Sequence, residues 1–183
     1  MPFAKLDQDR IVAEALALLN EEGLAQVSLR KVATRLGVGV SSLYWHVEDK
    51  SALYRLMSGR VFRACLEAVP PADDWRIWLR DFAHALWQAQ LTVRDAHQLI
   101  AQAPRNEADN GRTRADIVGR LAAMGLDPAI AAPAQLSIQA LVTGWTTLHA
   151  RPGGGLDQDA FRAALDALIA GWEAKAGQFS RSG

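Results

Sequence analysis

The chain of 183 residues is poor in cysteine and shows no excess of either charge, with 20 Lys and Arg against 20 Asp and Glu. Its single cysteine, Cys65, excludes an internal disulfide framework and a zinc site built on cysteine pairs, and it is typical of a reducing compartment. No apolar run approaches the ~20 residues of a membrane span, and the short polar N-terminus does not resemble a secretion signal. We therefore expect a cytoplasmic chain, complete as written, with one or two domains and no membrane partner.

The sequence also lacks the local motifs of common enzymes. It has no zinc-ligand spacing, no Gly-rich phosphate loop and no G-x-S-x-G motif, and its carboxylates are scattered like surface residues and helix caps. We expect no catalytic site, no metal and no cofactor. A helical enzyme that uses Glu or His pairs from different helices is the alternative within this class.

Apolar residues recur with helical spacing along the whole chain, and no segment alternates with the period of two that marks a strand. The pattern predicts an all-α protein of nine helices, with a bend near Pro133. We expect these helices from near Asp7 to Gly23, from Ser28 to Gly37, from Val40 to about His46, from near Asp49 to before Pro70, from Asp73 or Asp74 past Leu86, from Arg94 to Ala101, from about Asn110 to Met124, from Pro128 to about His149, and from Asp157 to about Lys175.

Positive charge is concentrated between residues 28 and 63, a segment that contains seven Lys and Arg but only two acidic residues. Such a face suits a polyanion, although a solvated helix surface has the same composition. Within it, Gly37-Val38-Gly39 joins two short helices, and the second helix carries hydroxyl and aromatic side chains. This arrangement predicts a DNA-binding helix-turn-helix, in which Leu43 and Val47 hold the second helix on the core.

The stretch SLRKVATRLGVGVSSLYWHVEDKSAL, residues 28–53, resembles the DNA-binding domain of TetR-type transcriptional repressors, and within that family it is closest to the tetracycline-repressor type. The similarity continues more loosely through DDWRIWLRDFAHAL and TVRDAHQLIAQAP. The resemblance implies a three-helix DNA-binding domain over residues 1–50, a connecting helix over 51–66, and a helical ligand-binding and dimerisation domain over 67–183. It also implies a small-molecule-responsive repressor that binds a palindromic operator as a homodimer.

Carried over residue by residue, the resemblance places Arg30, Val40, Ser41 and Ser42 near base edges, and Ser28, Tyr44, His46 and Lys50 near phosphates. Trp45 belongs to the same expected DNA-binding surface. As alternatives, Tyr44 could pack in the core or cap a turn, Trp45 could pack against the first helix, and His46 could be an ordinary surface histidine. Val40-Ser41-Ser42 replaces the Gln-Pro-Thr of the tetracycline-repressor type, so the operator sequence is expected to differ.

The polar and magnesium-binding positions of the tetracycline site are apolar in this chain. Leu66, Phe82 and Ile100 stand at the matching positions, and Ala103-Pro104 replaces Arg-Pro. We therefore expect an apolar or aromatic effector that needs no metal. His97 lies one turn before Ile100 and could supply a displaced polar contact, or it could be a histidine satisfied within the fold. Aromatic stripes that only fill the core are the alternative to a ligand cavity, and they would leave a constitutive DNA-binding protein without effector. The expected ligand-binding residues are Leu66, Trp78, Phe82, Leu86, His97, Ile100, Pro104, Ile117 and Leu121.

The last two predicted helices, 127–149 and 157–175, have longer apolar faces than one small domain needs to bury. They carry the small residues Ala140, Gly144, Ala167, Ala170 and Gly171, which allow close approach between helices. Two such helices from each of two chains predict a four-helix dimer interface, which is also how the family dimerises. The alternative is that these faces pack only within the chain.

Overall fold

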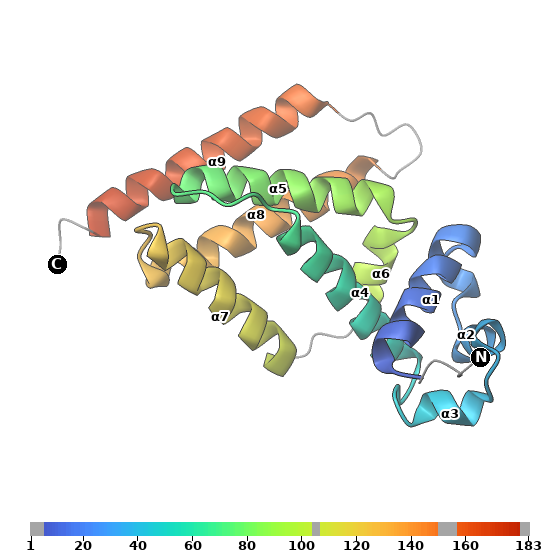
Figure 1. Ribbon diagram of the computed structural model, residues 1–183. Coiled ribbons are helices and arrows are strands. Elements are labelled where there is room, and N and C mark those ends of the chain that lie inside the picture. Colours follow the sequence, from blue (N-terminus) through green and yellow to red (C-terminus); the bar gives the residue numbers. More distant parts are fainter. Residues whose placement is uncertain (1–5, 104–106, 150–156, 180–183) are drawn as a thin grey trace. The chain divides into compact units, whose positions relative to one another are not determined.

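The computed structural model describes residues 6–103, 107–149 and 157–179, and these residues form helices and no strand (Figure 1). Contacts divide the chain into an N-terminal unit, residues 1–64 with 89–105, and a C-terminal unit, residues 65–88 with 106–183. The all-α class is confirmed. Its elements are α1 (Gln8–Glu22), the short 3-10 turn η1 (Leu24–Gln26), α2 (Leu29–Leu36), α3 (Val40–Tyr44), α4 (Lys50–Glu67), α5 (Trp75–Thr92), α6 (Ala96–Gln102), α7 (Glu107–Ala123), α8 (Pro128–His149) and α9 (Gln158–Phe179).

The ends of the first helices are set by capping residues. The Asp7 carboxylate accepts a hydrogen bond from Arg10 N at 2.9 Å, and Ser28 Oγ accepts one from Lys31 N at 3.2 Å. Gly37 ends α2 in the left-handed region, with φ of 68°, where glycine carries no steric penalty. Gly37 thus ends α2 three residues before α3 begins, which is the short turn that a helix-turn-helix requires.

The core of the N-terminal unit joins the faces of α1, α2, α3 and α4. Ile11, Leu18 and Leu53 are fully buried in it. Leu43 and Val47 are 0% and 2% exposed, so the prediction that they hold the second helix of the motif on the core is confirmed. Because both contacts face inward, the other side of α3 is left for solvent or a ligand.

The segment around α6 belongs to the N-terminal unit. Asp95, in the left-handed region at φ 53°, accepts a hydrogen bond from Leu24 N to its Oδ2 at 2.9 Å. Arg94 Nη1 donates to the Glu21 carbonyl at 2.7 Å, and Leu99 is buried in the same core. The sequence partition placed this segment in the second domain, whereas its contacts are with α1, η1 and their core. The predicted division into a DNA-binding domain, a connecting helix and a ligand-binding domain concerns function, and it stays a prediction.

The C-terminal unit is a bundle of α5, α7, α8 and α9. α7 packs against α8, and α8 against α9. Ion pairs join α5 to α9, with Arg76 Nε 2.8 Å from Glu173 Oε1 and Arg80 Nε 2.9 Å from Asp166 Oδ1. The Phe161 ring of α9 lies 4.1 Å from the Trp87 ring of α5, centroid to centroid. Much of the aromatic content therefore fills the core of this bundle.

Within the described ranges, no helix taken singly has the length and apolarity to cross a membrane. The segments 113–123 and 128–148 pass that test only as a pair, across a bend of 116°.

Candidate nucleic-acid interface

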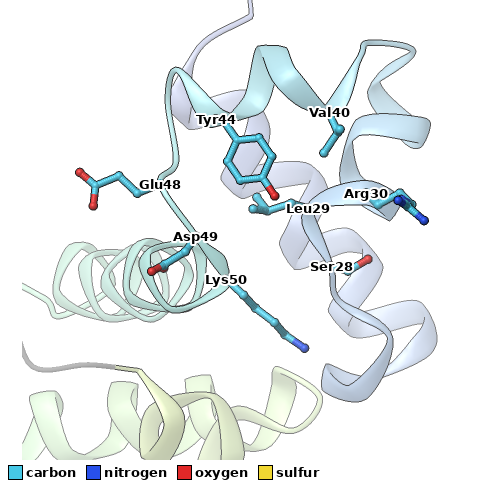
Figure 2. A pocket seen from close by; sticks show the side chains of 8 residues that line it. All are labelled: Ser28, Leu29, Arg30, Val40, Tyr44, Glu48, Asp49 and Lys50. Atoms are coloured by element: carbon cyan, nitrogen blue, oxygen red, sulfur yellow. The ribbon is translucent and has the colours of Figure 1, made fainter.

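A shallow groove of about 470 Å³ lies between α2, α3 and the start of α4 (Figure 2). Figure 2 shows the Tyr44 ring directed towards Leu29, with the Lys50 side chain extending beneath them and Glu48 turned the other way. Because α3 follows α2 after only three residues, the groove brings both helices of the motif to one surface. Its lining residues are Ser28, Leu29, Arg30, Val40, Tyr44, Glu48, Asp49 and Lys50.

The outer side of α3 exposes aromatic and hydroxyl-bearing side chains. Trp45 is 89% exposed and Tyr44 is 54% exposed, so the alternatives of packing against the first helix and in the core are wrong for these two residues. Ser41 and His46 are also exposed, and Val40 and Ser42 are half-buried. The helix ends at Tyr44, two residues earlier than predicted. The Tyr44 and Trp45 rings, at the end of α3 and just after it, are therefore accessible to a partner.

Four basic residues on α2 and at the start of α4 divide into two groups by their partners. Lys31 Nζ lies 2.8 Å from Glu22 Oε2, and Arg35 pairs with both Glu14 and Glu21 of α1. The hydrogen bond from Arg35 lowers the pKa of Glu21. These two cations therefore brace α2 against α1.

Arg30 and Lys50 form the second group. Neither has a carboxylate partner in the part of the chain that the structure describes, and both are exposed on the groove. The Lys50 ammonium lies 5.2 Å from the centroid of the Tyr54 ring. Cations that carry no internal ion pair are the ones available to a polyanion.

At the start of α4, the Lys50 ammonium is better suited to attract an anion than the helix end beside it. The Asp49 carboxylate already accepts a hydrogen bond from Ala52 N at 2.7 Å, and Glu48 is exposed next to it. Two negative charges oppose the attraction that a free helix N-terminus has for phosphate.

The comparisons with known proteins agree with this geometry. The family described as "Bacterial regulatory proteins, tetR family" matches residues 11–57. The class A tetracycline repressor from transposon 1721 of Escherichia coli is 36% identical over 118 residues, which is 61% of this chain and 55% of the repressor. The crystal structure of a TetR variant from Acinetobacter baumannii AYE in complex with minocycline is 31% identical, covers 94% of this chain and 99% of its own, and has a TM-score of 0.74.

This chain belongs to the TetR family. The resemblance seen in the sequence and the helix-turn-helix within a helical fold are thereby confirmed. A second TetR-family structure, Streptomyces coelicolor ActR with actinorhodin, is 25% identical, covers 95% of this chain and all of its own, and has a TM-score of 0.76. The chain spans little more than half the length of the curated tetracycline repressors that it matches.

The expected ligand-binding residues of this TetR-family chain fall in both units. Trp78, Phe82 and Leu86 of α5 and Ile117 and Leu121 of α7 are buried in the C-terminal unit, and half-buried Leu66 belongs to it as well. The Trp78 and Phe82 rings stack, with centroids 5.4 Å apart. His97 and Ile100 are half-buried in the N-terminal unit, and Pro104 lies outside the described residues.

Sequence reasoning missed two features of the structure. Leu29, Glu48 and Asp49 line the groove, and the only available signal was their position next to Ser28 and Lys50. Gln135 is buried on α8 at 5% exposure, and a glutamine within an apolar helical stripe was the signal that could have marked it.

Proposed function

We propose that the protein is an effector-responsive transcriptional repressor that binds a palindromic DNA operator as a homodimer in the cytoplasm. One observation carries this proposal: α3 exposes polar and aromatic side chains beside Arg30 and Lys50, two cations that form no ion pair with any described residue. A short helix held on its core by one face can enter the major groove with the other.

The groove residues suit distinct contacts with DNA. Arg30 can form two hydrogen bonds with a guanine edge, and Val40, Ser41 and Ser42 at the start of α3 lie near base edges. Lys50, Tyr44 and His46 contact phosphates, and the exposed Trp45 ring adds apolar contact area beside them. Ser28 Oγ accepts the helix-capping bond from Lys31 N, so its hydroxyl hydrogen is still free to be donated to a phosphate oxygen.

Selection of palindromes from random duplexes tests the DNA-binding part. The selected duplex is expected to bind about 10³-fold or more tightly than random DNA at physiological salt, as measured by fluorescence anisotropy. Equal affinity for selected and random duplexes would contradict a sequence-specific operator.

The effector proposed for this repressor is an apolar or aromatic molecule bound without metal in the C-terminal unit. The buried side chains of Trp78, Phe82 and Leu86 on α5, with Ile117 and Leu121 on α7, offer an apolar and aromatic lining. Two TetR-family relatives of similar fold were solved with small molecules, minocycline and actinorhodin. Apolar walls with a few polar groups are typical of such sites.

An effector can weaken DNA binding only by the difference between its affinities for two arrangements of the DNA-binding domains in the dimer. α4 is the proposed link, because its residues up to Ala64 belong to the N-terminal unit and those from Cys65 onward belong to the C-terminal unit. Phe82→Ala is expected to change the response to an inducer found by screening aromatic compounds for DNA release, while affinity for DNA without inducer stays within a few fold. Added EDTA should leave induction unchanged.

A constitutive DNA-binding protein is the second candidate. The observation in its favour is that Phe82 and Leu121 are fully buried, so an effector must open space among well-packed side chains. DNA affinity that no compound in the screen changes would favour this candidate. A full, unshifted response of the Phe82→Ala protein would instead contradict the assignment of Phe82 to the pocket, and a strict magnesium requirement would contradict binding without metal.

A further inference from the structure

Gln135 is a polar side chain in the middle of an apolar helix face. It is 5% exposed on α8, and the buried residues one turn before and after it, Ala131 and Ile138, are both fully inaccessible. A buried carboxamide is stable only when its donors and acceptor find partners, because water no longer supplies them.

The Gln135 carboxamide has one partner in the described part of the chain. Its Nε2 donates to Gln139 Oε1 at 3.0 Å, and neither its Oε1 nor its second N–H bonds to any other described residue. If the amide oxygen and nitrogen of Gln135 were exchanged, hydrogen-bonding groups would still lack partners, because the single contact with Gln139 involves only one of the two atoms. An acceptor and a donor therefore stay open inside the bundle.

Thr146, a buried polar residue on the same helix, is different. At 4% exposure, its Oγ1 donates to carbonyls of its own helix, Val142 O at 3.0 Å and Thr143 O at 3.2 Å. The Gln135 amide has no such bond to the backbone of α8 in the described residues. A leucine would fill the same place without leaving an open polar group, so the glutamine has a cost in stability that calls for a role.

The position of Gln135 suggests that role. α8 packs against α7, and α7 supplies Ile117 and Leu121 to the proposed effector site. Polar groups in such sites are few, and they orient the ligand and provide selectivity. An open acceptor next to an open donor matches a hydroxyl group, which both donates and accepts.

We propose that Gln135 is the polar anchor of the effector site, and that it binds the hydroxyl group of an aromatic effector. The hydroxyl donates to the amide oxygen and accepts from the free N–H. This inference rests on the proposed effector-responsive function. It narrows the effector from any apolar or aromatic compound to a hydroxylated aromatic one.

Two probes of nearly equal shape, 2-naphthol and 2-methylnaphthalene, test the anchor directly. We expect the full-length protein to bind 2-naphthol about fivefold more tightly, by titration calorimetry, because only the hydroxyl pairs with Gln135. In Gln135→Leu this preference is lost while 2-methylnaphthalene still binds. Gln88→Leu, the same change at an exposed position of α5, should keep the preference.

Thermal unfolding without any probe gives an independent readout. If the Gln135 amide is open, Gln135→Leu leaves the melting temperature unchanged or raises it by a few degrees. A lower melting temperature in both Gln135→Leu and Gln135→Met, of which the second keeps the unbranched shape, would show that the amide is satisfied by a buried water or has a purely structural role. A lower melting temperature in both variants would therefore overturn the proposal under either explanation.

The outcomes separate this inference from the proposed function. Equal binding of both probes by the wild-type protein would overturn the anchor and leave the aromatic effector site in place. If neither probe binds while operator DNA is still bound, the anchor is wrong, the aromatic effector is decided by the wider compound screen, and the DNA-binding function stands.

Discussion

At the scale of single residues, ion-pair partners decide which cations are available to the proposed DNA partner. Arg30 and Lys31 are neighbours on α2, yet Lys31 Nζ is held between Glu22 Oε2 at 2.8 Å and Gln26 Oε1 at 2.7 Å, while Arg30 faces the groove. The count of basic residues in the sequence could not distinguish the paired lysine from the unpaired arginine, because the fold, and not the count, brings the glutamates of α1 close to α2. Within the described residues, the structure thus separates Arg30, which has no carboxylate partner, from its paired neighbour Lys31.

Alanine substitutions should separate the roles of these residues. Lys50→Ala is expected to weaken binding to operator and random DNA alike and to lower the salt slope by about one. Arg30→Ala should cost about 1–3 kcal/mol at one base position and relax the preference there. Lys31→Ala is the control and should change both quantities little. Anisotropy titrations over a salt series measure these effects, and an equal loss in Lys50→Ala and Arg30→Ala without a change in base preference would exclude Arg30 as a base-reading residue.

Cys65 illustrates burial at the same scale. The thiol is 2% exposed, and burial raises its pKa from 9.0 to about 12. The unfolded chain therefore loses this proton first as pH rises, so stability from this group is lost between about pH 9 and 12. Urea unfolding should show a smaller alkaline loss in Cys65→Val than in the wild type, and iodoacetamide should label the wild-type thiol only after unfolding. Rapid labelling of the folded protein would contradict its burial.

At the scale of elements, capping residues made most helix ends predictable. Asp7, Ser28 and Asp127 cap the helices that they were expected to start, and Gly23 and Gly37 end theirs. The sequence did not predict that the segment of α6 joins the N-terminal unit, because that depends on the bond from Leu24 N to Asp95, 71 residues away. The sequence motif predicted most of the residues that line the groove. It could not predict the ion pairs that decide which of the basic residues are available to an anion.

Two glycines on neighbouring elements should respond to alanine in opposite ways. Gly23 has φ of 89°, and a Cβ there would lie 3.0 Å from Asp95 Oδ2, so Gly23→Ala should destabilise the protein by about 1–3 kcal/mol. A Cβ at Gly59, within α4, would meet nothing within 4 Å, so Gly59→Ala should stabilise it by about 0.5–1 kcal/mol. Urea denaturation measures both values, and a destabilised Gly59→Ala would mean that α4 needs this glycine for another purpose.

At the scale of the whole molecule, two helices have faces that the described residues leave exposed. Leu136 and Leu148 of α8 are 53% and 54% exposed, and with Ala140 and Gly144 they recur every four residues along one stripe. On α9, Ala167, Ala170 and Gly171 are exposed as well. The described part of the chain therefore does not pack against these residues, and a second copy with the same stripes offers a matching surface.

The dimer prediction is tested with a matched pair of exposed apolar residues. Leu136→Arg places a charge in the proposed interface and should give a monomer by analytical ultracentrifugation, with operator affinity lower by about 10²-fold or more, because a single reading head loses the gain from binding two half-sites. Ile77→Arg on α5, where Ile77 is 52% exposed, carries the same change outside the stripes and should stay dimeric with unchanged DNA affinity. Circular dichroism confirms that both variants are folded. A wild-type protein that is monomeric at all concentrations, or a Leu136→Arg protein that still dimerises, would show that the α8 and α9 stripes serve another purpose.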